Sequence, residues 1–409
     1  MFGTNKPKII TDEDKINELL TRGVENTFPN SDFVKTRLKS GVKLSIYLGI
    51  DPTGTTLHLG HAIQLKKLSQ FQKLGHQIIL LMGDFTAMIG DPTDKTAVRK
   101  KLTHKEVLNN LKDYKTQASK FISFSGPNKA FFKFNSEWLG KMKFGDVLEL
   151  ASLVTVEQMM KREMFQRRNE EGKPIYIHEF MYPLMQGYDS VMMDVDGEIG
   201  GNDQMFNMLT GRDLIKILKN KEKFVITTKL LVDSNGSKMG KTEGNMVALN
   251  QTPEDMFGRV MSWSDDLIIS GFELITDVSF DEYKSIKEEF EKGVSNPKEY
   301  KITLAKEIVK ICHGEEAAQK AAETFMNTFS KGEFPEDSQV VSASKEEKIM
   351  DILVEKKVVE SKSEFRRLVE AGAVSDYPDK KINDPNETVG EGERKIKIGK
   401  KTFVILKSN

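Results

Sequence analysis

The segment from Asp51 to His61 (DPTGTTLHLGH) has the residue types of a site that handles phosphate. It lies between a strand-like apolar segment and a segment with apolar residues at helical spacing, and backbone N–H groups at the start of a helix attract phosphate. His58 and His61 stand three residues apart, so their imidazoles share a helical face and could stabilise charge on a transferring phosphoryl group. Gly60 leaves room for a flat base. Two surface histidines beside a helix cap are the alternative, but the flanking strand and helix favour chemistry.

A second group, Lys238-Met239-Gly240-Lys241-Thr242, follows another apolar strand-like segment. Two lysines three residues apart in a glycine-containing loop could reach a polyphosphate. The segment also resembles a P-loop, but a P-loop has four residues between its glycines. Here three residues separate Gly236 from Gly240, and Asn235 occupies the position that needs glycine. The P-loop interpretation is therefore disfavoured, while a solvated basic loop remains an alternative for this group alone.

Three polar residues, Tyr182, Gln186 and Asp189, stand at i, i+4 and i+7, which places them on one face of a helix. A hydroxyl, an amide and a carboxylate are costly to bury without partners. An outer polar stripe is possible, but apolar residues occupy much of the remaining helix surface: Met181, Leu184, Met185 and Tyr188. This composition favours a polar pocket.

Two further groups are less specific by themselves. Gly200-Gly201-Asn202-Asp203-Gln204 puts glycines at a predicted strand-to-helix turn, which would permit close approach of a nucleotide, although a helix cap has the same composition. Lys95 and Arg99 lie in the charged segment 94–101, which alone is typical of a solvated charge run.

The elements that must position these groups alternate in type. Leu44–Ile50 is typical of a buried strand, His58–Leu74 of a helix and Gln77–Met82 of a second strand, and this order predicts a parallel sheet. Further strands are predicted at Ala130–Phe134, Val191–Val195 and Phe224–Val232, with helices at 104–122 and 203–219. Residues 1–40 are typical of a polar helical lead-in.

Length and composition bound the architecture. The chain has 409 residues, which predicts two or three domains of the α/β class. We expect a Rossmann-like parallel-sheet catalytic domain at 1–250, a helical domain at 251–333 and a small α+β domain at 345–409, with a charged linker near 331–337.

Charge and cysteine content exclude several classes. Lys+Arg and Asp+Glu both total 61, so the net charge neither suggests nor excludes a nucleic-acid partner. The single cysteine, Cys312, excludes an internal disulfide framework and a cysteine-rich zinc site, and we expect no structural metal. We see neither a signal peptide nor an apolar run of about 18 residues, so we expect no membrane span and a cytoplasmic location.

Together the two phosphate-handling groups resemble the HIGH and KMSKS signatures of class I aminoacyl-tRNA synthetases. They stand here as HLGH and KMGKT, with glycine at the third position of the second signature and both lysines retained. The resemblance implies a Rossmann-like core, ATP as a substrate and Mg²⁺ that arrives with ATP. The catalytic donors that it implies are His58, His61, Thr53, Lys238, Lys241, Lys95 and Arg99.

The other groups resemble the tyrosyl branch of this family. The resemblance implies that Tyr47 and Asp189 bind the phenol of tyrosine, while Tyr182, Gln186 and Asp91 hold its ammonium group. Such a site rejects an amino acid without the hydroxyl, a rule for which tyrosyl enzymes are the usual example. Further tyrosine-binding residues implied are Asp51, Thr86 and Gln204, and those implied for ATP are Gly49, Gly60, Gly201, Asp203 and Lys241.

The C-terminal segment resembles an S4 RNA-binding domain. Ser361 and Glu364 have the spacing of a helix capping box, and Arg394–Lys407 contains six Lys or Arg and no acid. The resemblance implies RNA contacts by Lys362, Arg366 and Arg367; without it, solvated charge would be the plain interpretation. Family members are homodimers, so we expect a homodimer here through the helical insertion around 130–170.

The expected function is ATP-dependent activation of tyrosine followed by its transfer to tRNA(Tyr). A tryptophanyl synthetase shares the core, but it has no need of Tyr47 and Asp189 converging on a phenol. An adenylyltransferase of the same superfamily would keep the paired histidines without an RNA module. A non-catalytic RNA-binding scaffold would need neither His58 and His61 nor the two lysines of the second signature.

Overall fold

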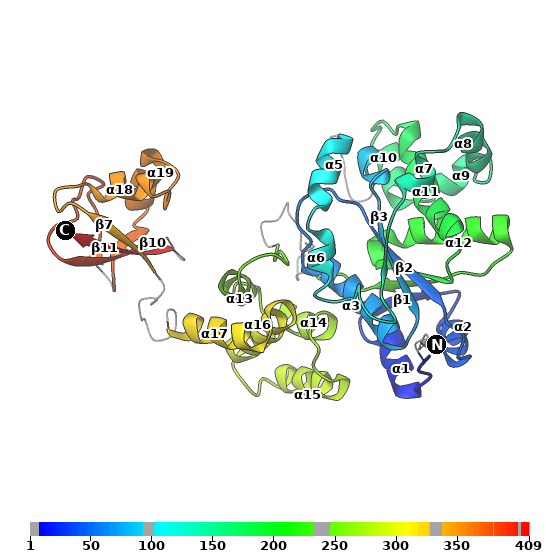
Figure 1. Cartoon of the computed structure of the whole chain (residues 1–409), viewed down its shortest axis with the longest axis horizontal. Coiled ribbons are helices and arrows are strands. Elements are labelled where there is room, and N and C mark those ends of the chain that lie inside the picture. The colour runs from blue at the N-terminus through cyan, green and yellow to red at the C-terminus, as the bar shows by residue number, and fades with distance from the viewer. Residues whose placement is uncertain are drawn as a thin grey trace, which may run out of the picture. The chain divides into compact units, whose positions relative to one another are not determined.

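The computed structural model describes residues 8–92, 102–232, 246–327, 338–378, 380–399 and 402–408. The chain forms two compact units, Met1–Ala318 and Gln319–Asn409, which we describe separately. Figure 1 shows the sheet and most of the helices in the first unit and a smaller sheet in the second.

A six-stranded sheet forms the centre of the first unit. Its strands are β1 (Val24–Phe28), β2 (Ser45–Ile50), β3 (Gln77–Met82), β4 (Phe131–Phe134), β5 (Gly197–Gly201) and β6 (Phe224–Thr228). The order is β1-β6-β5-β2-β3-β4, with every neighbouring pair parallel except β1 and β6. From β2 the chain continues to β3 and β4 on one side, and β5 and β6 are then added on the other side of β2. Ligands of such sheets bind where the strand order reverses, at the carboxyl ends of the strands.

Helices cover this sheet and extend beyond it. They are α1 (Glu13–Thr21), α2 (Ser31–Lys39), α3 (Leu59–Lys73), α4 (Thr86–Ile89), α5 (His104–Leu111), α6 (Tyr114–Ala118), α7 (Ser136–Leu139), α8 (Phe144–Ala151), α9 (Val156–Met160), α10 (Glu163–Glu170), α11 (Ile177–Met193) and α12 (Met205–Lys219). The helices α11 and α12 cross closely, because a Cβ on Gly187 would lie 3.2 Å from the Cα of Gly211. On the sheet side, Tyr182 and Met185 of α11 share a buried cluster with residues of β2 and β3.

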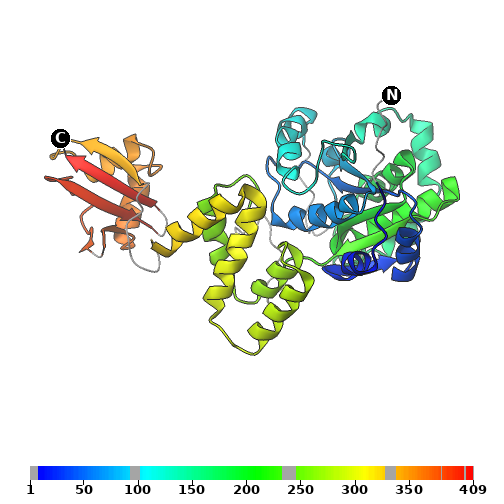
Figure 2. The same cartoon turned by 60° about the horizontal axis from the view of Figure 1, so that its bottom comes forward.

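A helical segment follows the sheet. It contains α13 (Pro253–Met261), α14 (Leu267–Leu274), α15 (Phe280–Glu291) and α16 (Pro297–His313), while α17 (Glu315–Phe325) spans the boundary between the units. Figure 2 shows these helices in green to yellow, packed against one another. The buried guanidinium of Arg22 donates to the carbonyl oxygens of Phe272, Glu273, Thr276 and Val278. The end of α14 and the segment after it are thereby joined to the end of α1.

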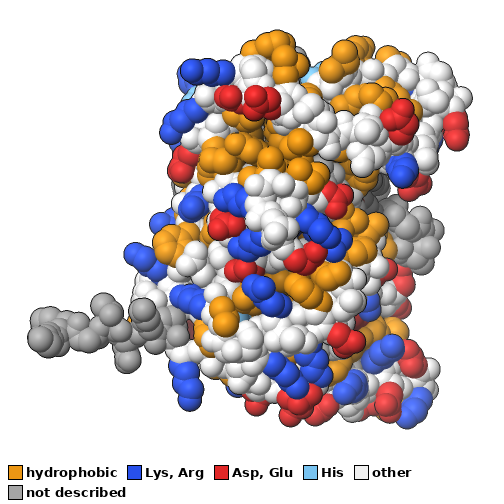
Figure 3. All heavy atoms as spheres, turned by 90° about the vertical axis from the view of Figure 1, so that its right-hand side faces the viewer, with side chains coloured by type: hydrophobic (Ala, Val, Ile, Leu, Met, Phe, Trp, Pro, Cys, Tyr) orange, Lys and Arg blue, Asp and Glu red, His pale blue; other side chains and the backbone are white. Residues whose placement is uncertain are grey.

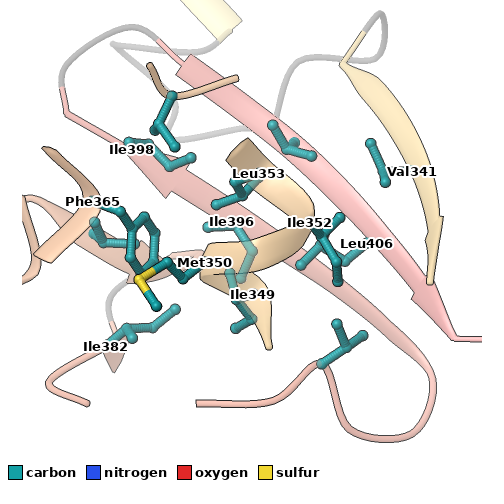
Figure 4. Packing of buried hydrophobic residues seen from close by; sticks show 14 of the residues in the cluster. Val341, Ile349, Met350, Ile352, Leu353, Phe365, Ile382, Ile396, Ile398 and Leu406 are labelled. Carbon is teal, nitrogen blue, oxygen red and sulfur yellow. The ribbon is translucent and has the colours of Figure 1, made fainter. Parts of the chain in front are cut away.

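In its described residues, the second unit contains the end of α17, a five-stranded sheet and two helices. After α17, its elements are β7 (Gln339–Ala343), α18 (Ile349–Glu355), α19 (Lys362–Glu370), β8 (Val374–Asp376), β9 (Lys380–Lys381), β10 (Glu393–Ile398) and β11 (Thr402–Ser408), with strand order β7-β11-β10-β8-β9. Leu353 and Phe365 point from the helices toward Ile396 on the sheet (Figure 4). The sheet begins with β7, before residue 345.

The structure confirms the α/β class with a Rossmann-like parallel sheet, a helical segment and a small α+β unit. The strand predicted at Val191–Val195 is wrong, because α11 continues to Met193 and the strand is β5 (Gly197–Gly201). Three of the five residues of β5 are glycine, which is poor in strand propensity. Packing requires one of them: a Cβ on Gly197 would lie 2.1 Å from the Phe224 ring.

Two other predicted elements differ. The single helix predicted at 104–122 is divided into α5 and α6, because the backbone leaves helical geometry at Asp113. The polar helical lead-in contains α1 and α2 but also β1, a short edge strand formed by antiparallel pairing with β6. Within the described residues, no helix has the length and apolar character needed to cross a membrane.

Candidate active site

One cavity of about 340 Å³ gathers the predicted site residues at the carboxyl ends of β2 and β5. The predicted residues that line it are Tyr47, Gly49, Asp51, Thr53, His58, Gly60, His61, Thr86, Asp91, Tyr182, Gln186, Asp189, Gly201, Asp203 and Gln204. Four predicted cations, Lys95, Arg99, Lys238 and Lys241, lie outside the described residues. The cavity therefore sits at the reversal of strand order and collects side chains from segments far apart in the chain.

The paired histidines form the cap of α3. The Nδ1 atom of His58 accepts from the Gly60 backbone N–H at 3.1 Å, and the Nδ1 atom of His61 accepts from the His58 backbone N–H at 3.1 Å. An imidazole nitrogen that accepts cannot carry a proton, so each neutral ring carries its proton on Nε2. A Cβ on residue 60 would lie 2.8 Å from the His58 ring. Glycine at this position therefore makes room for the His58 ring as well as for a flat base.

The loop before α3 is held by α5 and α6. The Asn110 amide donates to the Pro52 carbonyl at 2.8 Å, the Tyr114 hydroxyl donates to the Gly54 carbonyl at 2.6 Å, and Gln117 accepts from the Leu57 N–H at 2.7 Å. Burial raises the pKa of Tyr114 to about 12, so its phenol stays protonated and can donate. These contacts fix the backbone that carries Thr53.

The chain just after the second motif is hydrogen-bonded to the first motif. The Leu59 N–H donates to the Val247 carbonyl at 3.0 Å, and the Leu249 N–H donates to the Leu57 carbonyl at 2.9 Å. Residues 233–245, which contain the KMGKT group, are outside the described residues. Val247 and Leu249, which follow them in the chain, nevertheless lie beside the histidine pair.

Asp189 lines the cavity and is almost fully buried. Its carboxylate accepts from Trp138 Nε1 at 2.8 Å and from Asn135 Nδ2 at 3.3 Å. Burial raises the pKa of Asp189 well above that of a surface aspartate, while the two hydrogen bonds act to lower it. Tyr47 lies nearby, and burial likewise raises the pKa of its phenol well above 10, so the hydroxyl keeps its proton.

Two more carboxylates line the cavity. Asp51 accepts from the Thr86 hydroxyl at 2.7 Å and from the Tyr182 hydroxyl at 2.8 Å. Asp91 accepts from Gln204 Nε2 at 2.9 Å and lies 3.4 Å from Arg162 Nη2. Carboxylate and hydroxyl oxygens collected in this way form a set of acceptors suited to an ammonium group.

The turn after β5 presents Asp203. A Cβ on Gly201 would lie 2.5 Å from the Asp203 carboxylate and 3.1 Å from Gln64 Nε2. Glycine at this position therefore lets the Asp203 carboxylate lie against the strand end. The neighbouring Asn202 is fixed by bonds from Asn26 and Thr227.

Several residues of the site had no sequence signal that we could read. Asn135 and Trp138 bind Asp189, Arg162 contacts Asp91, and a buried group behind Tyr47 and Gln186 consists of Ser190, Glu198 and Lys223. Most of them come from segments without a recognisable motif, and only the fold brings them to the cavity. Among the described residues, no group of three His, Cys, Asp or Glu is arranged to hold a metal ion.

In the second unit, the predicted RNA-binding residues lie on α19. Arg366 and Arg367 are exposed, and Lys362 forms an ion pair with Asp351 at 2.9 Å. The basic segment that starts at Arg394 is partly structural, since the Arg394 guanidinium pairs with Asp376 and Glu387.

Comparison with known proteins identifies the family. The family model described as tRNA synthetases class I (W and Y) matches residues 39–330. The tyrosine–tRNA ligase of Desulfotalea psychrophila is 44% identical over 393 residues, covering 95% of this chain and 96% of that protein. The tyrosine–tRNA ligase of Thermotoga maritima is 42% identical, covering 96% and 97% of the two chains.

Solved structures agree on the fold. A C-terminally truncated mitochondrial tyrosyl-tRNA synthetase from Aspergillus nidulans matches with a TM-score of 0.65 at 22% identity, covering 78% of this chain and 95% of that one. A tyrosyl-tRNA synthetase from Archaeoglobus fulgidus, complexed with L-tyrosine, matches with a TM-score of 0.59 at 22% identity, covering 76% and 99% of the two chains. On its family match and its close relatives, the chain belongs to the class I tRNA synthetases and, within them, to the tyrosine–tRNA ligase family.

Proposed function

We propose that this chain activates tyrosine with ATP, forming tyrosyl-adenylate and pyrophosphate, and then transfers tyrosine to the 3′ end of tRNA(Tyr). One observation carries the proposal. A single cavity is lined both by Asp189 and Tyr47 and by the His58–His61 pair, so groups suited to a hydroxyl-bearing side chain and to a nucleotide meet in one site.

In this proposal the phenol of tyrosine lies between Tyr47 and Asp189. Its ammonium group lies near Tyr182, Gln186 and Asp91, where acceptor oxygens line the cavity. The remaining predicted residues divide between the two substrates: Asp51, Thr86 and Gln204 for tyrosine, and Gly49, Gly60, Gly201 and Asp203 for ATP.

The first step needs little proton transfer, because the tyrosine carboxylate is ionised at pH 7. A carboxylate oxygen bonds to the α-phosphorus of ATP as the bond from that phosphorus to pyrophosphate breaks. Alignment and charge stabilisation supply the catalysis. The donors are the Nε2–H groups of His58 and His61, with Thr53, Lys95, Arg99, Lys238 and Lys241. We infer that Mg²⁺ enters with the polyphosphate, since Mg²⁺ is commonly held through substrate phosphates.

In the second step a ribose hydroxyl of the terminal tRNA nucleotide bonds to the tyrosyl carbonyl carbon. The bond from that carbon to the AMP phosphate oxygen breaks, and the hydroxyl proton passes to solvent. We assign RNA binding to α19 through Lys362, Arg366 and Arg367, and the anticodon side to residues 251–333. Protein synthesis implies a cytoplasmic location.

We infer a homodimer from an exposed apolar face. Phe144 and Leu148 on α8, Val156 on α9 and Ile177 at the start of α11 are all exposed. Figure 3 shows hydrophobic side chains gathered in groups on the side of the molecule where α8 lies in Figure 1. Large exposed apolar patches mark interaction sites, and this face belongs largely to the predicted 130–170 insertion.

The test is a charging assay with unfractionated bacterial tRNA, ATP, Mg²⁺ and one labelled amino acid at a time. Tyrosine should become acid-precipitable with tRNA, and tryptophan and phenylalanine should not. Charging with tryptophan instead would contradict the proposal, as would the absence of charging by folded protein with every amino acid tested.

A further inference from the structure

A lysine is buried behind the amino-acid end of the cavity. Lys223, just before β6, has no exposed surface in its side chain, and its ammonium forms an ion pair with Glu198 of β5. The same ammonium donates to Ser190 Oγ at 2.8 Å and to the Met208 carbonyl at 3.2 Å. An ammonium has three N–H donors, so each donor has an acceptor and the group is held in one orientation.

The neighbouring helix α12 leaves room for this ammonium only because it has a glycine there. A Cβ on Gly211 of α12 would lie 2.8 Å from Lys223 Nζ and 3.0 Å from Ser190 Oγ. Burial acts to lower the pKa of Lys223, and Glu198 opposes that effect. A buried ion pair often gives no more stability than apolar residues of the same volume. The pair therefore needs an explanation other than stability, and its contacts toward the cavity supply one.

The Glu198 side of the pair reaches the ammonium-binding end of the cavity. Gln186 Nε2 donates to Glu198 Oε1 at 3.3 Å, and both residues line the cavity. With its NH₂ group turned to Glu198, the Gln186 amide has its carbonyl oxygen left to face a ligand. A substrate ammonium only donates hydrogen bonds, so this is the orientation that it requires.

The Lys223 side reaches the phenol end. Lys223 donates to Ser190 Oγ, and Ser190 Oγ lies 3.0 Å from the Tyr47 hydroxyl oxygen. With one lone pair occupied by the ammonium, Ser190 can give its own proton to Tyr47. Glu198 also acts on the Tyr47 phenol and keeps it protonated. Because Lys223 pairs with the Glu198 carboxylate, the Tyr47 O–H can donate to a ligand instead. A substrate phenol must both donate and accept, and Asp189 is the acceptor at this end.

We propose that Lys223 and Glu198 form a positioning pair that sets the hydrogen-bond direction at both ends of the amino-acid site. The pair makes Tyr47 a donor to the substrate phenol and Gln186 an acceptor from the substrate ammonium. The inference rests on the proposed tyrosine activation and deepens it: the site is built for an aromatic amino acid that carries both a hydroxyl and a free ammonium.

The test compares two double variants with the unaltered full-length protein. Lys223→Met with Glu198→Gln keeps the charge balanced and leaves Gln186 an acceptor, so it removes only the effect of the pair on Tyr47. Lys223→Met with Glu198→Leu removes its effects on both Tyr47 and Gln186. Steady-state pyrophosphate exchange gives KM for tyrosine, KM for ATP, and kcat/KM for tyrosine and phenylalanine, while thermal unfolding verifies that each variant is folded.

Both variants should raise KM for tyrosine and lower the tyrosine-to-phenylalanine ratio of kcat/KM, each by about tenfold or more. The reason is that Tyr47, no longer held as a donor, loses its buried hydrogen bond to the substrate phenol. KM for ATP should stay within about twofold, because the pair does not reach the histidine end. Only the Glu198→Leu variant should also lose preference for tyrosine over 3-(4-hydroxyphenyl)propionate, which lacks the ammonium group, as a competing ligand.

The matched control is Arg212→Met with Glu222→Gln. It removes an ion pair of α12 and the segment before β6 without changing a residue that lines the cavity. Equal losses of kcat/KM for tyrosine and phenylalanine, or variants that behave like this control, would overturn the inference alone. Unaltered protein with no tyrosine-dependent exchange would overturn the proposed function and the inference together.

Discussion

At the scale of single residues, the polar groups of the cavity are fixed by neighbours that determine which hydrogen bonds they can offer. Asp189 receives two hydrogen bonds from the protein, and the two histidines have their Nδ1 atoms occupied by backbone donors. A ligand therefore meets the Asp189 acceptor in the amino-acid site and Nε2 donors at the histidine pair. Each of these assignments predicts the effect of a substitution.

Asp189→Asn keeps the shape of the side chain but removes its charge. The substrate phenol then loses a hydrogen bond to a charged group, which contributes about 1.5–3 kcal/mol, so kcat/KM for tyrosine should fall about tenfold to a hundredfold. The loss for phenylalanine should be much smaller. Pyrophosphate exchange with both amino acids measures this, and equal losses for the two would remove Asp189 from phenol recognition.

His58→Asn distinguishes the structural role of His58 as the N-cap of α3 from its proposed catalytic role. Asparagine is a favourable N-cap residue, so α3 should keep its start and the thermal midpoint should change little. The Nε2–H donor is lost, and removal of one preorganised donor to a transition state lowers kcat by about a hundredfold or more. Exchange kinetics at saturating tyrosine and ATP give the result; an unchanged kcat would favour a purely structural histidine pair.

The site could be predicted only where its residues form compact sequence patterns. The HLGH group, the Tyr182–Asp189 face and the turn at 200–204 carry their spacing in the sequence and meet in one cavity. Asn135 and Trp138 bind Asp189 from 54 and 51 positions away, and Lys223 binds Ser190 from 33 positions away. Since their contacts arise from sheet order and helix crossing, local spacing gave no sign of them.

At the scale of elements, those marked by a local sequence pattern were predicted, and those that depend on tertiary pairing were not. The apolar strands β2 and β3 and the amphipathic α3 were predictable because burial and periodicity mark them in the sequence. The strand β5 was misplaced because three of its five residues are glycine, of which Gly197 packs closely against Phe224. The strand β1 was missed because pairing with β6 creates it. Both misses are strands whose formation depends on a distant partner.

The junction of α1 with α3 depends on a buried lysine. Lys67 of α3 donates to the Leu19 and Arg22 carbonyl oxygens at 2.7 and 2.8 Å, which satisfies backbone acceptors at the end of α1. Burial lowers the pKa of Lys67 to about 7. In the unfolded chain the amine holds its proton until about pH 10, so unfolding takes up a proton between these two pKa values.

Folded protein should therefore gain stability as pH rises from about 7 to about 10, by at most about 1.4 kcal/mol per pH unit from this group. Lys67→Met should remove that part of the increase while lowering stability overall through two unsatisfied carbonyls. Urea unfolding of both proteins across this pH range measures the difference. A parallel pH dependence in the two proteins would contradict the lowered pKa.

At the scale of the whole molecule, the exposed apolar face predicts the assembly. Phe144 is 78% exposed and Ile177 is 80% exposed. In a homodimer formed through this face, Phe144→Glu with Ile177→Glu buries charge and should give monomers in sedimentation velocity. Val294→Glu, at another exposed apolar position, is the control and should remain dimeric. Monomeric unaltered protein at micromolar concentration would contradict the homodimer.

The second unit should act on tRNA without acting on tyrosine activation. Arg366→Ala with Arg367→Ala removes two exposed cations from α19. The tRNA affinity should fall, and the slope of log K against log salt should decrease in magnitude by about two if both contact phosphates. Lys35→Ala with Lys39→Ala removes the same charge from α2 and should leave that slope unchanged. Unaltered tRNA binding by the arginine variant would place the contact elsewhere.

The central claim, that the cavity activates tyrosine, is tested most directly by amino-acid-dependent exchange of pyrophosphate into ATP without tRNA. Each of the twenty amino acids is offered separately to the full-length protein with ATP and Mg²⁺. We predict rapid exchange with tyrosine and none above background with phenylalanine or tryptophan. Exchange with tryptophan instead would contradict the roles of Tyr47 and Asp189, and no exchange with any amino acid from folded protein would contradict the enzyme assignment.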